Sequence, residues 1–142
     1  MTDRKASARW EGDLRSGNGT IQLGSGAFEG KYSFGSRFEG GPGTNPEELL
    51  GAAHAACFTM ALSSMLAKAG HPPTSVATTA VVHIEKGTDG FAITGIDLVT
   101  RGDVPGASEA EFQKWANEAK SNCIVSRALS AVPMTVAATL VA

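Results

Sequence analysis

The sequence predicts an α+β fold, because its strand-like and helix-like segments are segregated along the chain. Short alternating segments separated by glycine turns fill the first 40 residues, and one long helical segment begins near residue 46. A hairpin, two shorter helices and a closing strand follow. The length of 142 residues matches one domain of ordinary size, so we expect a single domain over residues 1–142.

Glycine-rich turns divide the first 40 residues into three expected strands. These strands cover residues 5–11, 20–23 and 31–34. The glycines that follow residue 23 lack the spacing of a dinucleotide-binding loop, and no helix follows them. We therefore expect these segments to form sheet rather than a nucleotide site.

A long helix is expected over residues 46–69, with clear signals at both ends. Asn45 is a good N-cap, and Glu47 and Glu48 fall in the first turn, where the helix dipole favours carboxylates. Gly70 ends the pattern. The helix would extend roughly 36 Å.

Apolar side chains surround this helix instead of forming one stripe. They are Leu49, Leu50, Ala52, Ala53, Ala55, Ala56, Cys57, Phe58, Met60, Ala61, Leu62, Met65 and Leu66. A helix that is apolar all round must be covered all round. Since one small sheet cannot do that, we expect a second chain to cover part of it.

The second half begins with a hairpin. Residues 75–85 alternate as a strand, residues 87–90 form the turn and residues 91–101 form the return strand. The apolar side chains of the return strand change parity at Gly95, which predicts a bulge there.

Two helices and a strand are expected to close the chain. Ser108 begins a capping box, and amphipathic spacing continues to an interruption at Asn122. A short helix over about residues 124–129 and a strand over residues 133–141 follow.

Composition excludes several classes of protein. A formal charge of −2 and the absence of a Lys/Arg cluster exclude a general nucleic-acid binder. The polar first residues do not resemble a signal peptide, and we expect no membrane-spanning segment, so a soluble cytoplasmic protein is predicted. Two cysteines in such a protein are more often reduced or redox-active than a permanent bridge.

Cys57 and Cys123 are the candidate reactive groups. Cys57 could be an inert core thiol, or a nucleophile if a second thiol and a cation lie within reach. Cys123 precedes a short helix whose N-terminal N–H groups could stabilise its thiolate. His54, three residues before Cys57, could join both sulfurs as a zinc ligand or could be a polar residue at the helix edge.

Several segments together resemble the OsmC branch of the OsmC/organic hydroperoxide resistance family. The central run is SRFEGGPGTNPEELLGAAHAACF over residues 36–58, and the resemblance extends to ARWEG at 8–12, GFAIT at 90–94 and NCIVS at 122–126. One departure is Ile124, where the family usually has proline.

The resemblance implies an OsmC-like fold, in which a long central buried helix is wrapped by antiparallel sheets in an intertwined homodimer. It implies a thiol peroxidase in which Cys57 attacks an organic or inorganic hydroperoxide and Cys123 resolves the sulfenic acid to a disulfide. A lipoyl-type dithiol then reopens the disulfide, and no cofactor or metal is needed. The residues matching the family's site arginine and glutamate are Arg37 and Glu47.

Elementary chemistry agrees with these roles. Arg37 is always charged, so it would favour a Cys57 thiolate, and Glu47 could hold the guanidinium in a bidentate pair. Glu47 and Cys57 are ten residues apart, or roughly 15 Å along a helix, so Glu47 is expected to come from the other subunit if both serve one site.

A ligand-binding protein of the same fold remains an alternative. Its apolar pocket would be lined by Phe28, Phe38, Phe58 and Met65.

Overall fold

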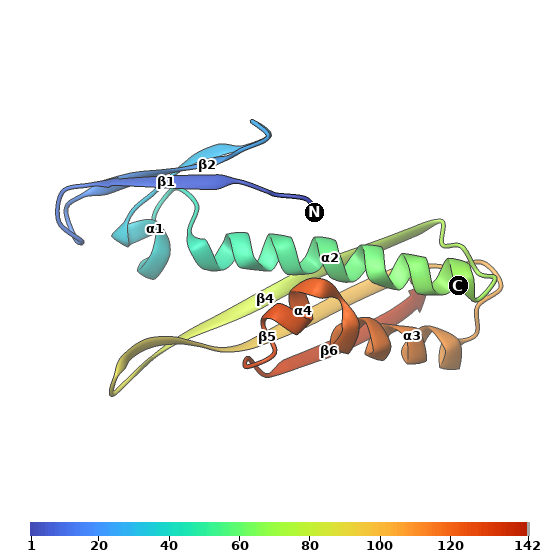
Figure 1. Ribbon diagram of the computed structural model, residues 1–142. Coiled ribbons are helices and arrows are strands. Elements are labelled where there is room, and N and C mark those ends of the chain that lie inside the picture. Colours follow the sequence, from blue (N-terminus) through green and yellow to red (C-terminus); the bar gives the residue numbers. More distant parts are fainter. Residues whose placement is uncertain (142) are drawn as a thin grey trace. The chain divides into compact units, whose positions relative to one another are not determined.

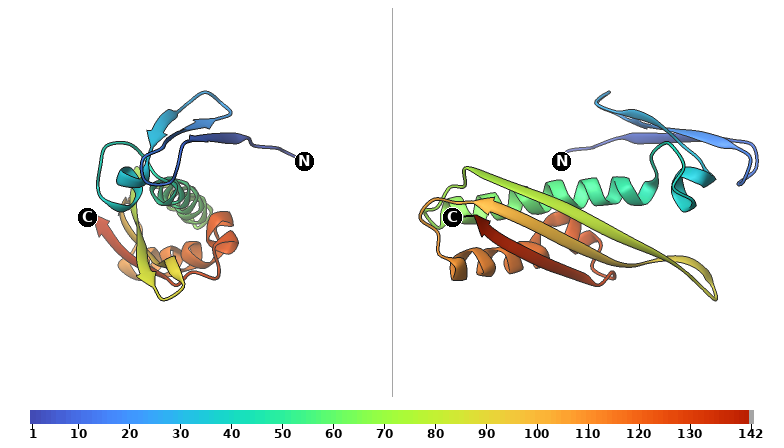
Figure 2. Two further views of the ribbon diagram at one scale, coloured as in Figure 1. Left: turned by 90° about the vertical axis from the view of Figure 1, so that its left-hand side faces the viewer. Right: turned by 180° about the vertical axis from the view of Figure 1, so that it is seen from behind.

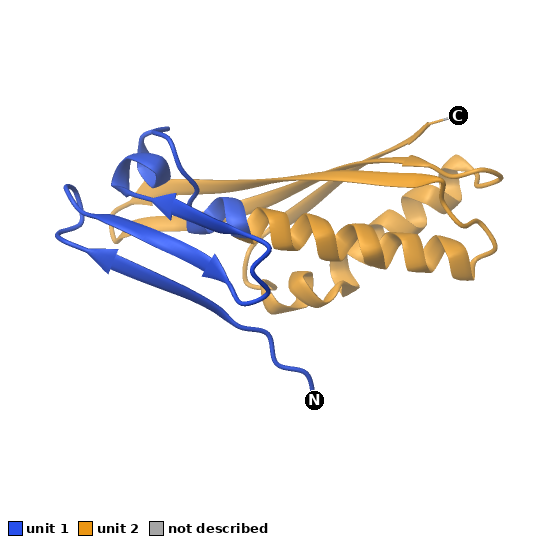
Figure 3. Ribbon diagram, turned by 90° about the horizontal axis from the view of Figure 1, so that it is seen from above, with its two compact units in different colours: residues 1–49 blue, residues 50–142 orange. Residues whose placement is uncertain are grey.

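The computed structural model describes residues 1–141 and divides into two compact units. The first unit is Met1–Leu49 and the second is Leu50–Ala142, of which residues 50–141 are described. Figure 3 shows the two units in different colours. The prediction of a single domain over residues 1–142 stays a prediction, and Ala142 lies outside the described residues.

The first unit is built on a three-stranded antiparallel sheet in the order β1-β2-β3 (Figure 1). Its strands are β1 (Ala6–Glu11), β2 (Asn18–Leu23) and β3 (Glu29–Tyr32). Trp10 and Tyr32 place their ring centroids 5.3 Å apart across the sheet. A Cβ on Gly19 would lie 2.5 Å from the Tyr32 ring, so only glycine lets the two rings approach this strand.

The expected strand over residues 31–34 is wrong at its end, because a helix begins there. Helix α1 (Phe34–Phe38) starts at Ser33, whose hydroxyl accepts from the Ser36 N–H while the Ser36 hydroxyl accepts from the Ser33 N–H. This reciprocal cap satisfies two backbone donors and turns the chain out of the sheet.

Helix α2 (Pro46–Lys68) confirms the predicted long helix and both of its end signals. Asn45 Oδ1 accepts from the Glu48 N–H at 2.7 Å. At the other end, Gly70 has a φ of +91°, and the His71 N–H reaches the Leu66 carbonyl at 2.8 Å. Only a residue that tolerates positive φ can close the helix in this way.

The second unit contains a mixed sheet, which corrects the expectation of antiparallel sheets only. Strands β4 (Ser75–Gly87) and β5 (Gly90–Asp103) form an antiparallel hairpin, but β6 (Met134–Val141) runs parallel to β5. Parallel pairing needs a long crossover, and the two helices between β5 and β6 supply it. The predicted bulge is confirmed, since the register shifts between His83↔Gly95 and Ile84↔Ile93.

The crossover consists of α3 (Glu109–Asn122) and α4 (Ile124–Ala128). The predicted capping box at Ser108 is confirmed, because its hydroxyl accepts from the Glu111 N–H. Gln113 of α3 donates to the Ala138 carbonyl of β6 at 2.7 Å, which ties the helix to the sheet. Helices α2 and α3 lie on the same face of this sheet (Figure 2).

Between these helices and the sheet lies the core of the second unit. Its buried members are Phe58, Leu62, Leu66, Ile96, Leu98, Val104, Phe112, Ala116, Ala119 and Cys123. One stripe of α2 is buried at every third or fourth residue, from Gly51 through His54 and Phe58 to Leu66. The opposite stripe is exposed, and Met60 is 75% exposed.

As expected from the sequence, the sheet of one chain covers only one face of α2, and the covering of the other face by a second chain stays a prediction. The expectation that the chain has no membrane-spanning segment stays a prediction. By length and composition alone α2 could cross a membrane. The core helix of a soluble protein has the same length and composition, and one face of α2 packs in the core of the second unit.

Candidate active site

The two cysteines lie in the second unit and are both free thiols. Cys57 is half-buried near the middle of α2. Cys123, only 3% exposed, is the residue at which α3 ends and α4 begins. Its backbone adopts an extended conformation, with φ −63° and ψ 149°, and so turns the chain from one helix into the next.

The first turn of α4 contacts both sulfurs. The Val125 N–H donates to Cys57 Sγ at 3.4 Å, and the Ser126 N–H donates to Cys123 Sγ at 3.3 Å. Helix α4 thus links the cysteine of α2 to its own N-cap cysteine. The side chain of Ile124, the departure from the family pattern, is 73% exposed and does not prevent this arrangement.

Burial controls the chemistry of Cys123. Removal from solvent raises the pKa of its thiol, and interaction with Cys57 raises the pKa further, whereas hydrogen bonding with Ser126 opposes the shift. Burial disfavours the charged form of a thiol, so Cys123 is protonated at neutral pH. The interaction with Cys57 also places the two thiols within each other's electrostatic reach.

His54 and Ser126 complete this cluster, and sequence reasoning did not find their relation. His54 Nε2 lies 2.7 Å from Ser126 Oγ, and Ser126 Oγ lies 3.0 Å from Cys123 Sγ. His54 is fully buried, and burial lowers its pKa, so its imidazole is neutral. The only sequence signals were the placement of His54 one turn before Cys57 and a serine three residues after Cys123.

The expectation that His54 could lie at a helix edge is wrong, because none of its surface is exposed. The zinc alternative also finds no support, since Nε2 of His54 faces Ser126. Within residues 1–141, no three His, Cys, Asp or Glu side chains form a group that could hold a metal ion.

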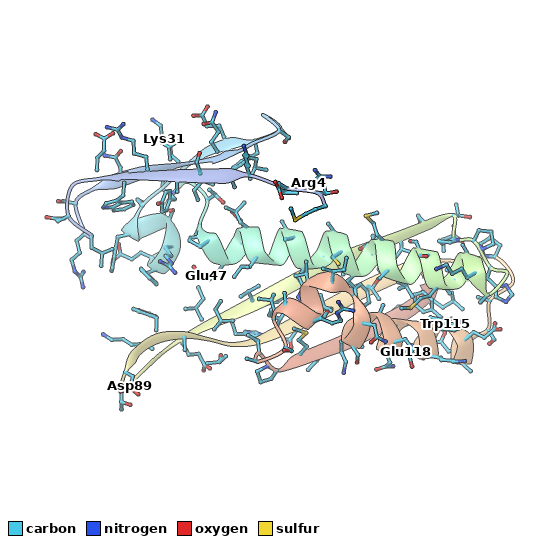
Figure 4. All side chains as sticks on the ribbon, in the orientation of Figure 1. Arg4, Lys31, Glu47, Asp89, Trp115 and Glu118 are labelled. Atoms are coloured by element: carbon cyan, nitrogen blue, oxygen red, sulfur yellow. The ribbon has the colours of Figure 1, made fainter. Side chains whose placement is uncertain are left out.

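Arg37 and Glu47 meet in the first unit, as predicted. Arg37 Nε donates to Glu47 Oε1 at 2.9 Å and Nη2 donates to Oε2 at 2.8 Å, a bidentate pair. Hydrogen bonding to Glu47 raises the pKa of the Arg37 guanidinium. Glu47 lies at the start of α2, as labelled in Figure 4.

The neighbouring acid has a different role. Glu48 accepts from the Thr44 hydroxyl at 2.8 Å, and its N–H is capped by Asn45. Glu47 is 6% exposed. It lies in the first turn of α2 and also pairs with Arg37. The structure therefore brings the four predicted residues together as two pairs, one in each unit.

The side chains proposed for the alternative pocket belong to different units. Phe58 is fully buried in the core of the second unit. Phe38 lies in the first unit, beside a cavity of about 220 Å³. That cavity is lined by Trp10, Leu14, Tyr32, Ser33, Phe34, Arg37 and Phe38.

Comparison with known proteins establishes the family. The model of a family described as OsmC-like protein matches residues 38–137 of this chain. The chain belongs to the OsmC-like family. The matched region contains Glu47, Cys57 and Cys123, and Arg37 lies one residue before it.

Individual OsmC-like proteins agree with this assignment. Peroxiredoxin OsmC of Escherichia coli (strain K12) is 51% identical over 129 residues, which are 90% of this chain and 90% of that protein. An OsmC-like protein from Mycoplasma pneumoniae shares the fold, with a TM-score of 0.76 over 99% of both chains at 19% identity. An organic hydroperoxide resistance protein from Elizabethkingia anophelis is 26% identical, with a TM-score of 0.71 over 98% of this chain and 96% of that one.

Proposed function

We propose that this OsmC-like protein is a thiol peroxidase that reduces organic and inorganic hydroperoxides. The observation that carries the proposal is the pair of free thiols, Cys57 and Cys123, whose sulfurs accept hydrogen bonds from adjacent amides in the first turn of α4. A relative named peroxiredoxin OsmC at 51% identity supports the same activity.

The proposed reaction has three steps. The Cys57 thiolate attacks the outer peroxide oxygen, the O–O bond breaks, and the alkoxide leaves and takes a proton to become an alcohol. Cys57 becomes a sulfenic acid, and Cys123 attacks its sulfur to form a disulfide and water. A dithiol, lipoyl-type by resemblance to the family, then reduces the disulfide by thiol exchange. A resolving thiol close to Cys57 traps the sulfenic acid before further oxidation.

Titration with cumene hydroperoxide tests this function. One equivalent should consume both thiols of the reduced protein, and Cys57→Ser should abolish the reaction. Cys123→Ser should still react once and should accumulate a sulfenic acid that dimedone captures. Slow oxidation that is unchanged by Cys57→Ser would refute the peroxidase and would favour the ligand-binding alternative.

We further propose that the protein acts as a homodimer in which Arg37 and Glu47 of one chain serve Cys57 of the other. Glu47 precedes Cys57 by ten residues on α2, a rise of roughly 15 Å, so the two side chains of one helix do not meet. The exposed apolar stripe of α2, which includes Met60, is the surface that a second chain would cover.

Subunit mixing tests the shared site. Glu47→Ala and Cys57→Ser chains are each expected to be inactive, and heterodimers formed after mixing and refolding should regain roughly one active site each. Activity that does not return, despite heterodimers detected by native mass spectrometry, would contradict the shared site and leave the thiol chemistry untouched.

A further inference from the structure

A continuous path of hydrogen-bonding atoms leads from Cys123 to the interior of the second unit. It passes from Cys123 Sγ to Ser126 Oγ over 3.0 Å and from Ser126 Oγ to His54 Nε2 over 2.7 Å. Three elements contribute to it, because Cys123 ends α3, Ser126 belongs to α4 and His54 to α2. The thiol chemistry proposed above does not use the last two residues.

The burial of His54 needs an explanation. Its side chain is fully buried, and Nδ1 has no hydrogen-bond partner among residues 1–141. Burial of an unpaired polar atom is unfavourable, and an apolar residue would fill the same space without that penalty. The bond from Nε2 to Ser126 is therefore the feature that gives an imidazole an advantage at this position.

Cys123 has a proton to lose during disulfide formation. The thiolate is the attacking form of a cysteine, yet burial raises the pKa of this thiol. With 3% of Cys123 exposed, bulk water has little access to it. Ser126 Oγ lies beside the sulfur, and the imidazole behind it is neutral, because burial lowers the pKa of His54. A neutral imidazole can accept a proton.

We propose, building on the peroxidase function above, that Ser126 and His54 form a proton relay that activates Cys123 as it resolves the Cys57 sulfenic acid. The Cys123 S–H proton passes to Ser126 Oγ while the Ser126 hydroxyl proton passes to His54 Nε2. The S–S bond forms, the S–O bond of Cys57 breaks and hydroxide leaves. His54 then releases the proton, which converts hydroxide to water. Cys123 is oxidised and Cys57 is reduced.

The two residues differ in their roles. Ser126 contacts the reacting sulfur through both its hydroxyl and its N–H, so it is a catalytic residue. His54 acts through Ser126 and is a positioning residue that also holds the proton. Among the described residues, the ionisable group that interacts with Cys123, at the junction of α3 and α4, is Cys57 on α2.

The relay predicts a distinctive pH profile for disulfide formation. In the wild type the rate should be nearly constant between about pH 6.5 and pH 8.5, because neutral His54 removes the proton throughout this range. Without the relay, Cys123 must ionise on its own, and the rate should rise about tenfold per pH unit. A variant that only loosened the structure would be slower at every pH without acquiring this slope.

The experiment follows one turnover of the reduced protein with one equivalent of cumene hydroperoxide. Intact-protein mass spectrometry after acid quenching separates the sulfenic acid from the disulfide. At pH 7, Ser126→Ala should slow disulfide formation by about 100-fold. His54→Gln, whose amide oxygen can still accept from the Ser126 hydroxyl but cannot take up a proton, should slow it by about 10-fold or more. In both variants the rate of disulfide formation should rise with pH. In Ser126→Thr, which keeps a hydroxyl, the rate should stay nearly constant over the same pH range.

Thr100→Val is the matched control. It removes a fully buried hydroxyl of the same unit, which bonds to Thr78 at 2.9 Å and is not part of the relay. Its disulfide formation should keep the wild-type rate and profile. If Ser126→Ala folds poorly, the comparison of His54→Gln with Ser126→Thr decides the question.

Three results would overturn the relay. They are a wild-type rate of disulfide formation in Ser126→Ala, a rate that does not change with pH in His54→Gln, and a slowing by Thr100→Val as large as that by Ser126→Ala. Failure of the peroxidase function itself looks different, because Cys57 of the wild type would then not be oxidised by the peroxide at all.

Discussion

Removal of the Arg37 guanidinium measures how strongly the ion pair stabilises the first unit. Two charge-assisted hydrogen bonds of 2.9 and 2.8 Å end on Glu47, which is only 6% exposed. Hydrogen bonds to charged groups contribute about 1.5–3 kcal/mol, but the Arg37 side chain is 39% exposed, so solvent screens the pair. We expect Arg37→Met to lower the free energy of unfolding by about 2 kcal/mol. Arg37→Lys, which keeps the charge but loses the bidentate hydrogen bonding of the guanidinium, should lower the free energy of unfolding by about 1 kcal/mol.

Urea unfolding at one fixed protein concentration, followed by tryptophan fluorescence, measures these changes. Arg15→Met is the matched control, because Arg15 lies 4.6 Å from the Phe34 ring much as Arg37 lies 5.0 Å from the Phe38 ring. The control should change stability by less than about 0.5 kcal/mol.

A double-mutant cycle isolates the pair from other effects. Arg37→Met combined with Glu47→Gln should recover about 1 kcal/mol relative to the sum of the single variants, since each single variant leaves an unpaired charge and the double variant leaves none. The reasoning is refuted if Arg37→Met costs no more than Arg15→Met, or if the two single changes add without coupling.

Further predictions concern Cys123, Asp97 and Gly70. Burial raises the pKa of Cys123, so iodoacetamide should modify Cys123 more slowly than Cys57. Peptide mass spectrometry should show that the modification rate of Cys123 is still rising at alkaline pH, and equal rates for the two cysteines would contradict this. The hydrogen bond from Thr135 lowers the pKa of Asp97, so this pair stabilises the fold above about pH 4 and the stability is lost as pH falls below it. In urea unfolding, the Asp97→Asn variant should not show this loss of stability at acid pH. Gly70→Ala should lower the unfolding free energy by about 1 kcal/mol in the same assay, because φ is +91°; an unchanged midpoint would count against this.

Local signals account for the parts of the fold that were predicted correctly. Asn45, Gly70 and Ser108 each act on backbone groups within a few residues, so their effects can be read from the chain itself. Helix α1 was missed because its five residues are too few to show a period, and its start depends on a reciprocal cap between two serines. The parallel pairing of β6 was missed because it depends on where the crossover helices return the chain.

The same distinction holds in the candidate site. Arg37 and Glu47 are ten residues apart, and a recognisable motif contains both. His54 and Ser126 are separated by 72 positions, and neither residue type signals the other. Only the packing of α2 against α4 brings them within hydrogen-bond distance.

Two adjacent amides of α4 point at two different sulfurs, Val125 at Cys57 and Ser126 at Cys123. The resonance frequency of an amide proton depends strongly on its acceptor. Two neighbouring cross-peaks in a nitrogen–proton correlation spectrum would therefore report separately on the oxidation state of each cysteine. The amide protons of Val125 and Ser126 can therefore be used to follow the two cysteines without attaching a label to either thiol.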